Sequence, residues 1–283
     1  MNNVQPPGSG SREWSSLQRR REGKGLAGAI VRSARVAALT ILVSLHVHAE
    51  NRALEIMREV ERRQRAASQS NLGAIEVVDS GGKVLNKAWR FHREGNRGSS
   101  RILVRFLTPP EVRGVGLLTL NHPDKPAEQW LYTPAIRRDR RVAPQEKSQR
   151  FMGTDFTHED MEERAVEGYD YELLGEEMFA GQPSWKIRAF YKSRDNTQYS
   201  QLYLWVRKDI VVNTYVEFYV AEKLRKTLRW DDWRQIQGIW SPHLAEMRDL
   251  ARRSTTRIRT SELRYNVGFE PEWFSLRNLR RAP

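Results

Sequence analysis

The densest group of chemically competent side chains in this sequence lies within residues 155–163. Those nine positions hold six acidic or imidazole side chains: Asp155, His158, Glu159, Asp160, Glu162 and Glu163. Such a group could coordinate a divalent cation or supply paired carboxylates for acid–base catalysis. A plainer structure also fits, because Thr157 and Asp160 have the spacing of a capping box and acids are favourable in the first turn of a helix. We favour the solvated helix cap and keep a metal site or an envelope enzyme as the alternative.

Familiar catalytic motifs are absent from the sequence. It has no G-x-S-x-G nucleophile elbow, no H-E-x-x-H zinc motif, no P-loop and no dinucleotide fingerprint. The histidines after residue 50 are scattered along the chain: His92, His122, His158 and His243. Because a hydrolytic triad or a zinc site needs converging side chains, the sequence predicts no catalytic residue, no metal and no cofactor.

A run of basic residues is the second unusual feature of the sequence. It places Arg137, Arg138, Arg140 and Arg141 around a single acid, Asp139. The run could dock acidic lipid headgroups or an acidic partner protein. It could equally form a charged hairpin that pairs with the acids after Asp155, although exposed pairs contribute little stability. Both interpretations remain open at this point.

Tryptophan is unusually frequent, with nine in the chain. Five of them lie in or beside candidate strands: Trp89, Trp130, Trp205, Trp230 and Trp240. A well-filled sheet core is the more common arrangement for such residues. A partly open barrel lined by them would instead form an apolar cavity that could hold acyl chains.

The N-terminal 49 residues have the pattern of an export signal. Arg32 and Arg35 precede the uncharged run 36–45, which is too short to span a bilayer, and Val47-His48-Ala49 fits a cleavage site after Ala49. A buried core helix or a weak membrane anchor is the alternative for this segment. We therefore predict a disordered leader plus signal peptide over 1–49, a single domain over 50–283, and a periplasmic location.

Composition limits what the exported chain could bind. Cysteine is absent, which excludes disulfides, thiolate metal sites and acylation of the chain itself as a lipoprotein. The formal net charge is +13, and removing the leader's seven Lys and Arg and its two Glu leaves +8. A moderately basic surface suits anionic lipids or acidic proteins, and export argues against nucleic acid.

After a short amphipathic helix over residues 52–65, the hydrophobic period changes from helical to two. Ile102, Val104 and Phe106, for example, alternate with Arg101 and Arg105. Strands are predicted at 75–78, 84–91, 102–107, 115–120, 129–132, 169–176, 184–191, 198–207, 213–220, 224–230, 244–249 and 255–265. Their spacing near ten residues predicts a curved antiparallel sheet or barrel, and residues 271–276 form a last helical turn on it.

The order of several motifs resembles the outer-membrane lipoprotein-sorting (LolA-like) family, in the branch associated with RND-type exporters. The motifs include Gln129-Trp130-Leu131-Tyr132-Thr133-Pro134, the Arg pairs up to Arg141, and Phe151-Met152-Gly153-Thr154-Asp155-Phe156. The last of these is the most specific, and the resemblance covers the chain after the leader. It implies a mainly β fold with short helices, namely an incomplete antiparallel β-barrel of LolA/LolB type with a helical plug that encloses a hydrophobic cavity.

The resemblance also implies a function and a site. The chain would be a monomeric periplasmic carrier of lipoprotein acyl chains or another lipid, passing cargo from an inner-membrane RND-type transporter toward an outer-membrane acceptor. A lipid-sensing or structural docking module is the alternative. The expected lining of the cavity is Trp89, Phe91, Val104, Phe106, Trp130, Tyr132, Phe151, Met152 and Phe156. The expected rim, where partners dock, is Arg137, Arg138, Arg140, Arg141, Asp155, Glu159 and Asp160.

Overall fold

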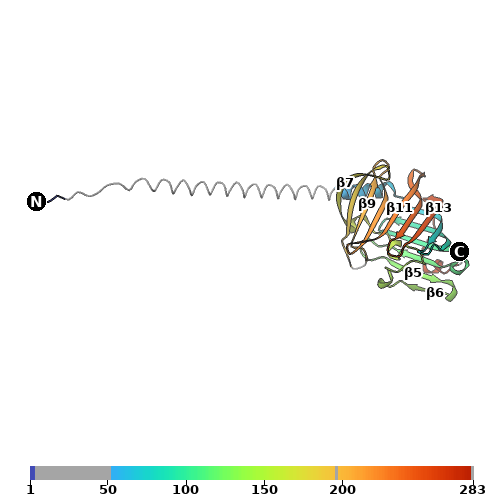
Figure 1. Ribbon diagram of the computed structural model, residues 1–283. Coiled ribbons are helices and arrows are strands. Elements are labelled where there is room, and N and C mark those ends of the chain that lie inside the picture. Colours follow the sequence, from blue (N-terminus) through green and yellow to red (C-terminus); the bar gives the residue numbers. More distant parts are fainter. Residues whose placement is uncertain (4–51, 195–196, 282–283) are drawn as a thin grey trace. The chain divides into compact units, whose positions relative to one another are not determined.

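The computed structural model describes residues 1–3, 52–194 and 197–281 (Figure 1). The folded unit considered below is Glu50–Pro283. The predicted leader and its cleavage site depend on residues 4–49, which lie outside the described residues, so the signal peptide remains a prediction. Within the described ranges, no helix combines the length and apolar character needed to cross a bilayer.

Antiparallel strands dominate the folded unit. A helix over residues 52–63 precedes them, and the short helix α2 (Leu276–Leu279) follows them. The strands of the described residues are β1 (Ser68–Val78), β2 (Val84–Asn96), β3 (Ser99–Thr108), β4 (Gly116–Leu120), β5 (Glu128–Thr133), β6 (Arg138–Arg141), β7 (Tyr169–Phe179), β8 (Gln182–Tyr191), β9 (Gln201–Arg207), β10 (Val212–Val220), β11 (Lys223–Ile236), β12 (Ile239–Asp249) and β13 (Ser254–Tyr265). Short 3-10 turns are η1 (Pro110–Val112), η2 (Pro134–Ile136), η3 (Pro144–Glu146), η4 (Glu159–Met161) and η5 (Val166–Gly168).

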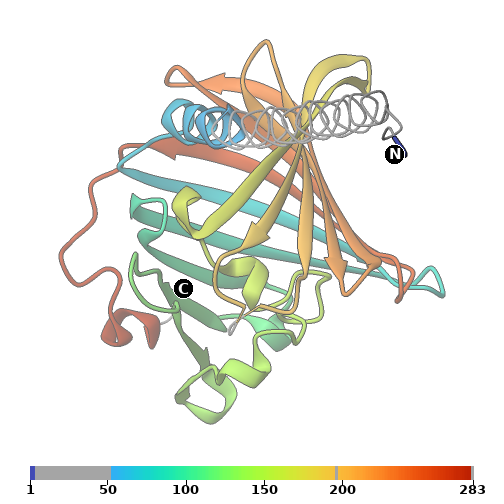
Figure 2. The same ribbon diagram turned by 90° about the vertical axis from the view of Figure 1, so that its left-hand side faces the viewer.

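All these strands belong to one open sheet. Its order is β6-β5-β4-β3-β2-β1-β13-β12-β11-β10-β9-β8-β7, so β6 and β7 are its two free edges. β1 pairs with β13 from Gln69↔Tyr265 to Val78↔Thr255, which joins the early and late halves of the chain. Figure 2 shows the strands around β1 to β5 crossing those around β8 to β12 at a steep angle, as in a strongly curved sheet. The expected incomplete barrel is thereby confirmed.

Period-two alternation separates the two faces of the sheet. In β3, Ile102, Val104 and Phe106 are buried in one core cluster, whereas Leu103 between them belongs to another. We call the face with Ile102 the inner face and the face with Leu103 the outer face. Since successive strand residues point to opposite faces, two separate coverings are needed to bury both sets.

Two segments cover the inner face. The helix over residues 52–63, called here the opening helix, packs its apolar stripe against β7 to β10 through Ala53, Ile56, Met57 and Val60. The segment between β6 and β7, residues 142–168, packs against β1 to β4 and β11 to β13 and is called the plug segment. The plug segment contains three 3-10 turns and no longer helix. The helical plug expected from the family resemblance is therefore mostly an irregular loop.

The outer face of β2 to β5 is covered by the end of the chain, residues 266–281. Helix α2 begins after Ser275, whose hydroxyl accepts a hydrogen bond from the Asn278 N–H at 3.1 Å. Leu103 and Leu118 pack there with Phe274 and Leu279. The predicted packing of residues 271–276 on the sheet is confirmed through Trp273, Phe274 and Leu276, although the helix itself starts later than expected.

Candidate functional site

A cavity in two parts lies between the inner face and its two coverings. The larger compartment has a volume of about 460 Å³ and the smaller one about 180 Å³. Together they reach the size range of small-molecule sites. Seven residues line both compartments, and we call the place they define the waist: Arg97, Phe156, Asp160, Glu162, Asn213, Leu228 and Trp230.

The larger compartment is rich in indole rings. Trp89 of β2 lines it together with Trp230 and Trp233 of β11. The Trp89 ring fits only because residue 73 of the neighbouring strand is Gly, since a Cβ there would lie 2.1 Å from Trp89 Nε1. Trp89 also meets Phe106 edge to face at 5.8 Å between ring centroids. These contacts fix the indole as a rigid part of the cavity wall.

The smaller compartment is rich in phenol rings. Tyr169, Tyr171, Tyr191 and Tyr199 line it together with Met57 of the opening helix. Burial raises the pKa of the Tyr171 and Tyr191 hydroxyls, because their ionised forms would be poorly solvated there. The rings therefore stay neutral at physiological pH and form a mainly apolar wall.

A neutral polar atom without a hydrogen-bond partner lies at the waist. Asn213 Oδ1 of β10 is buried and accepts no hydrogen bond. A register shift between Asn213 and Tyr215 in the pairing of β10 with β9 sets this side chain beside the cavity. A buried acceptor without a donor is unfavourable, so this atom is ready to accept from a ligand.

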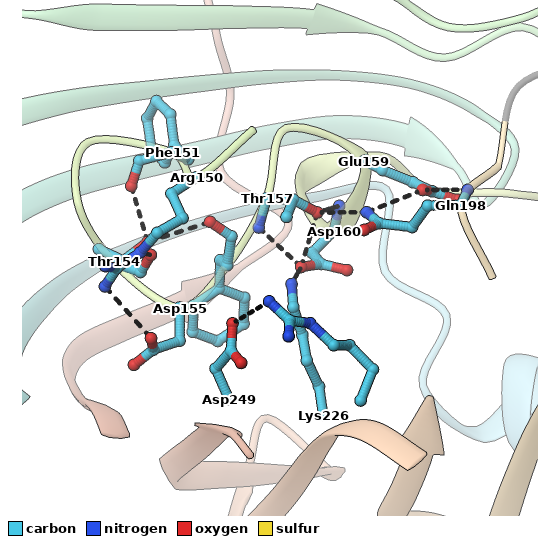
Figure 3. Close-up of polar contacts among 12 residues, drawn as sticks. Arg150, Phe151, Thr154, Asp155, Thr157, Glu159, Asp160, Gln198, Lys226 and Asp249 are labelled. Carbon is cyan, nitrogen blue, oxygen red and sulfur yellow. Dashed lines mark hydrogen bonds and ion pairs between the residues drawn. The ribbon is translucent and has the colours of Figure 1, made fainter. Parts of the chain in front are cut away.

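Asp155, which is fully buried, attaches the plug segment to strand β13 of the sheet. Its carboxylate accepts hydrogen bonds from Thr256 Oγ1 at 2.7 Å and from the Ser254 hydroxyl, both on β13. The Asp155 N–H donates to Thr256 Oγ1 at 2.8 Å, and Arg150 completes the set with an ion pair at 3.2 Å. Figure 3 shows Asp155 on this loop beside Arg150 and Thr154.

A buried ion pair also joins the plug segment to β11 (Figure 3). Asp160 Oδ2 pairs with Lys226 Nζ at 2.8 Å, and both side chains are at most 5% exposed. Asp160 Oδ2 also accepts from the Thr157 N–H at 2.7 Å, which is the predicted capping-box contact. Tyr199 donates its hydroxyl proton to Asp160 Oδ1 at 2.6 Å. Every oxygen of this carboxylate is therefore used within the fold.

The other acids of the run also form hydrogen bonds or ion pairs within the fold. Glu159 receives hydrogen bonds from Thr197 and Gln198, and Glu162 pairs with Lys147 at 2.8 Å. Glu163 accepts two hydrogen bonds from Arg93 at 2.7 and 2.9 Å. No cluster of acids and histidines among the described residues has the arrangement of a metal site.

Two expectations for the acidic run are corrected by these contacts. The run is not a solvated cap, and Asp155, Glu159 and Asp160 do not form an exposed rim, because the side chains of all three are buried within the fold. His158 is buried as well, and desolvation lowers its pKa, so the imidazole is neutral against Phe151. The carboxylates act as anchors for the loop.

The basic run forms the edge strand β6 and the turn before it. Arg137 adopts a left-handed conformation at the end of η2, and Arg138 is exposed. Arg140 pairs with Glu146 at 2.6 Å, and Arg141 pairs with Glu128 at 3.4 Å. The pairing with acids after Asp155, which was one of the two interpretations, does not occur in the described residues.

The predicted lining residues fall into three groups. Trp89, Phe91 and Phe156 line the cavity. Val104, Phe106 and Phe151 lie in the core of the inner face, and Met152 packs against it, but none of the four reaches either compartment. Trp130 and Tyr132 point to the outer face and pack on the C-terminal segment. They take that side because the alternation of β5 directs Leu131 inward.

Several cavity residues were not predicted from the sequence. Trp230 and Trp233 are three residues apart, yet both line the larger compartment because Asp232 between them has a φ of 53° and interrupts the alternation. The tyrosines of the smaller compartment could have been found from their clustering at Tyr169 and Tyr171. Asn213 left no signal in the sequence, because its inward position depends on the local register shift.

Comparison with known proteins gives one family and a set of solved structures. A family model described as "uncharacterized protein" matches residues 98–281. A DUF1329 family protein from Desulfovibrio piger is 26% identical, with a TM-score of 0.78 over 82% of this chain and 99% of that one. An outer membrane lipoprotein-sorting protein domain from Vibrio parahaemolyticus is also 26% identical, with a TM-score of 0.77 over 82% of this chain and 100% of its own.

A more distant structure shares the fold. It is a LolA superfamily protein from Nitrosomonas europaea, 18% identical, with a TM-score of 0.65 over 80% of this chain and 98% of that one. No match was found among curated proteins. The fold is thus that of LolA-like proteins, as the motifs in the sequence predicted.

Proposed function

The chain belongs to the DUF1329 family, and from that premise we propose that it is a periplasmic carrier that binds lipoprotein acyl chains or another lipid. The observation that carries this proposal is the two-part apolar cavity on the inner face. Each methylene group transferred from water into such a cavity gains about 0.8 kcal/mol. A cavity of this kind suits cargo that water would otherwise exclude.

Release of cargo requires a covering that can move, and the opening helix has the weaker attachment. Its described ion pairs, Arg52 with Glu176 of β7 at 3.5 Å and Arg58 with Glu167 of the plug segment at 3.1 Å, are about half exposed. Apolar side chains such as Met57 provide the remaining contact. Acyl chains could replace that apolar contact at little cost. The opening helix would therefore be displaced as cargo enters, while the plug segment stays in place.

The basic edge supports a docking role for the same carrier. Arg137 and Arg138 have no acidic partner within the described part of the chain, and Ile136 beside them is 64% exposed. Arg280 of the C-terminal segment joins this edge through Asp139 at 2.7 Å. An unneutralised basic edge suits an acidic partner or anionic headgroups. The edge would meet the donor, an RND-type inner-membrane transporter, or the outer-membrane acceptor.

Periplasmic location follows from the export pattern of residues 1–49 and remains part of the proposal. The lipoprotein-sorting name of the Vibrio parahaemolyticus structure supports it. Cleavage after Ala49 would leave a chain that begins just before the opening helix. Mass determination of the protein purified from periplasm would test this, with Glu50 expected as the first residue.

Native mass spectrometry of the protein purified from periplasm without detergent tests the carrier function. A complex with one or a few acyl-bearing molecules, identified after extraction, is the expected result. A ligand-free mass, together with no uptake from vesicles or from offered lipoproteins, would contradict the proposal. The protein would then be a structural or docking module of the envelope.

A further inference from the structure

The cavity has two compartments of unequal size, and this limits what shape of ligand fills it. The larger one, about 460 Å³, has indole walls, and the smaller one, about 180 Å³, has phenol walls. A single chain lying in one compartment would leave the other empty. A ligand that branches at the waist would place one apolar arm in each.

The waist determines the chemistry at the branch point. Its carboxylates already lie beside cations, because Asp160 pairs with Lys226 and Glu162 with Lys147, both at 2.8 Å. Asn213 Oδ1 is left as a buried acceptor without a donor. A ligand that brings an N–H or O–H group to this atom removes the cost of the unpaired acceptor, and a ligand with only ester oxygens there does not.

We propose that the cavity selects lipids whose two unequal apolar arms meet at a hydrogen-bond donor, an amide N–H or a hydroxyl, which donates to Asn213 Oδ1. The inference rests on the carrier function proposed above and specifies its ligand. Amide-linked two-chain lipids fit this description. Diacyl lipids with two ester linkages and no nearby donor fit it less well.

Sphingomyelin and phosphatidylcholine form a matched pair of probes. Both have two chains and a phosphocholine headgroup, but only sphingomyelin has an amide N–H and a hydroxyl where the chains meet. The full chain would be incubated with vesicles of each lipid, separated from them, and its bound lipid quantified. We expect wild-type protein to prefer sphingomyelin by about tenfold, the value of one hydrogen bond to a buried acceptor.

Asn213→Leu tests whether this preference depends on the proposed acceptor. The variant should keep its melting temperature, because it replaces an unpaired polar group with an apolar one of similar size. It should bind both lipids about equally. Equal uptake by the wild type, or an unchanged preference in Asn213→Leu, would overturn the inference. Uptake of neither lipid by a wild-type protein that still takes up offered lipoproteins would overturn the inference and leave the carrier function standing.

Ala189→Leu tests the two-arm shape separately. Ala189 lines only the smaller compartment, so a leucine there fills space that the shorter arm would occupy. We expect sphingomyelin uptake to fall at least about fivefold while uptake of single-chain lysophosphatidylcholine is retained. Parallel loss of both lipids in a variant with an unchanged melting temperature would overturn the branched-ligand inference.

Discussion

The opening helix and the plug segment cover the same inner face but are attached by different forces. The opening helix contributes an apolar stripe, including Ile56 and Val60, and its ion pairs are exposed. The plug segment adds buried ion pairs to its apolar contacts, above all Asp160 with Lys226. Apolar contact is non-directional and tolerates sliding, whereas a buried ion pair that loses one partner is strongly destabilised. The comparison predicts that the opening helix is displaced more easily than the plug segment.

Lys226→Met should have the largest effect, because it leaves Asp160 charged and buried without its cation. We expect a loss of about 3–5 kcal/mol in the free energy of unfolding, measured by chemical denaturation. The double variant Asp160→Asn with Lys226→Met is the matched control and should recover much of the loss. A small effect of Lys226→Met alone would show that the plug segment is no more firmly held than the opening helix.

Met57→Ala in the opening helix should have a smaller effect on stability and a larger one on exchange of cargo. The side chain is 4% exposed and borders the smaller compartment. Its truncation should cost about 2 kcal/mol. Hydrogen exchange should accelerate over residues 52–63 and stay unchanged over 142–168, and lipid transfer between vesicles should become faster. Faster exchange in both segments would contradict their independence.

Acidification should weaken the plug segment more than the opening helix. Burial lowers the pKa of His158 below its usual value near 6.5, so the unfolded chain binds this proton more readily than the folded one. The stability linked to His158 is therefore complete above about pH 6.5 and decreases as the pH falls toward the folded-state pKa. His92 on the outer face, with a pKa lowered to about 4, shifts stability in the same direction.

The difference between wild type and His158→Phe isolates the plug contribution. The free energy of unfolding, measured by chemical denaturation, should fall less between pH 7 and pH 5 in the variant than in the wild type. In the wild type, the protection of residues 142–168 against hydrogen exchange should be lower at pH 5 than at pH 7. An equal pH dependence in both proteins would exclude His158 as its source.

Arg58→Ala should have the smallest effect. The pair with Glu167 at 3.1 Å is about half exposed on both sides, and such pairs contribute at most about 0.5 kcal/mol on average. Melting temperature and lipid transfer should both remain close to the wild type, with Arg62→Ala as a control on the same helix. A large change would mean that the opening helix is held by charge after all.

The sequence was sufficient to predict the class of fold and the capping contact between Thr157 and Asp160, because both depend on local spacing. It was insufficient where a distant segment decides the outcome. Trp130 and Tyr132 seemed to face the cavity because β5 is apolar on both faces, and only the C-terminal segment reveals which side they take. β6 has no apolar alternation, so its three arginines and one aspartate gave no strand signal.

The acidic run shows the same limitation at the site. Its acids looked solvated because their partners are far along the chain, with Lys226 and Thr256 lying 66 and 101 residues from the acids they contact. Only the folded sheet brings these side chains together. The LolA-like fold was predictable from family motifs, whereas the inward position of Asn213 depends on a local register shift that the residue pattern does not reveal.

The pairing of β1 with β13 has a consequence for how the molecule is made. A chain that emerges N-terminus first presents β1 to β6 long before β13, the strand that joins them to the rest of the sheet, has been synthesised. Contacts so distant in sequence form slowly, and the unpaired edge of β1 is exposed to aggregation until then. The protein should therefore depend on chaperones that hold β1 to β6 unfolded, and chains truncated before β13 should be degraded without ever enclosing a cavity.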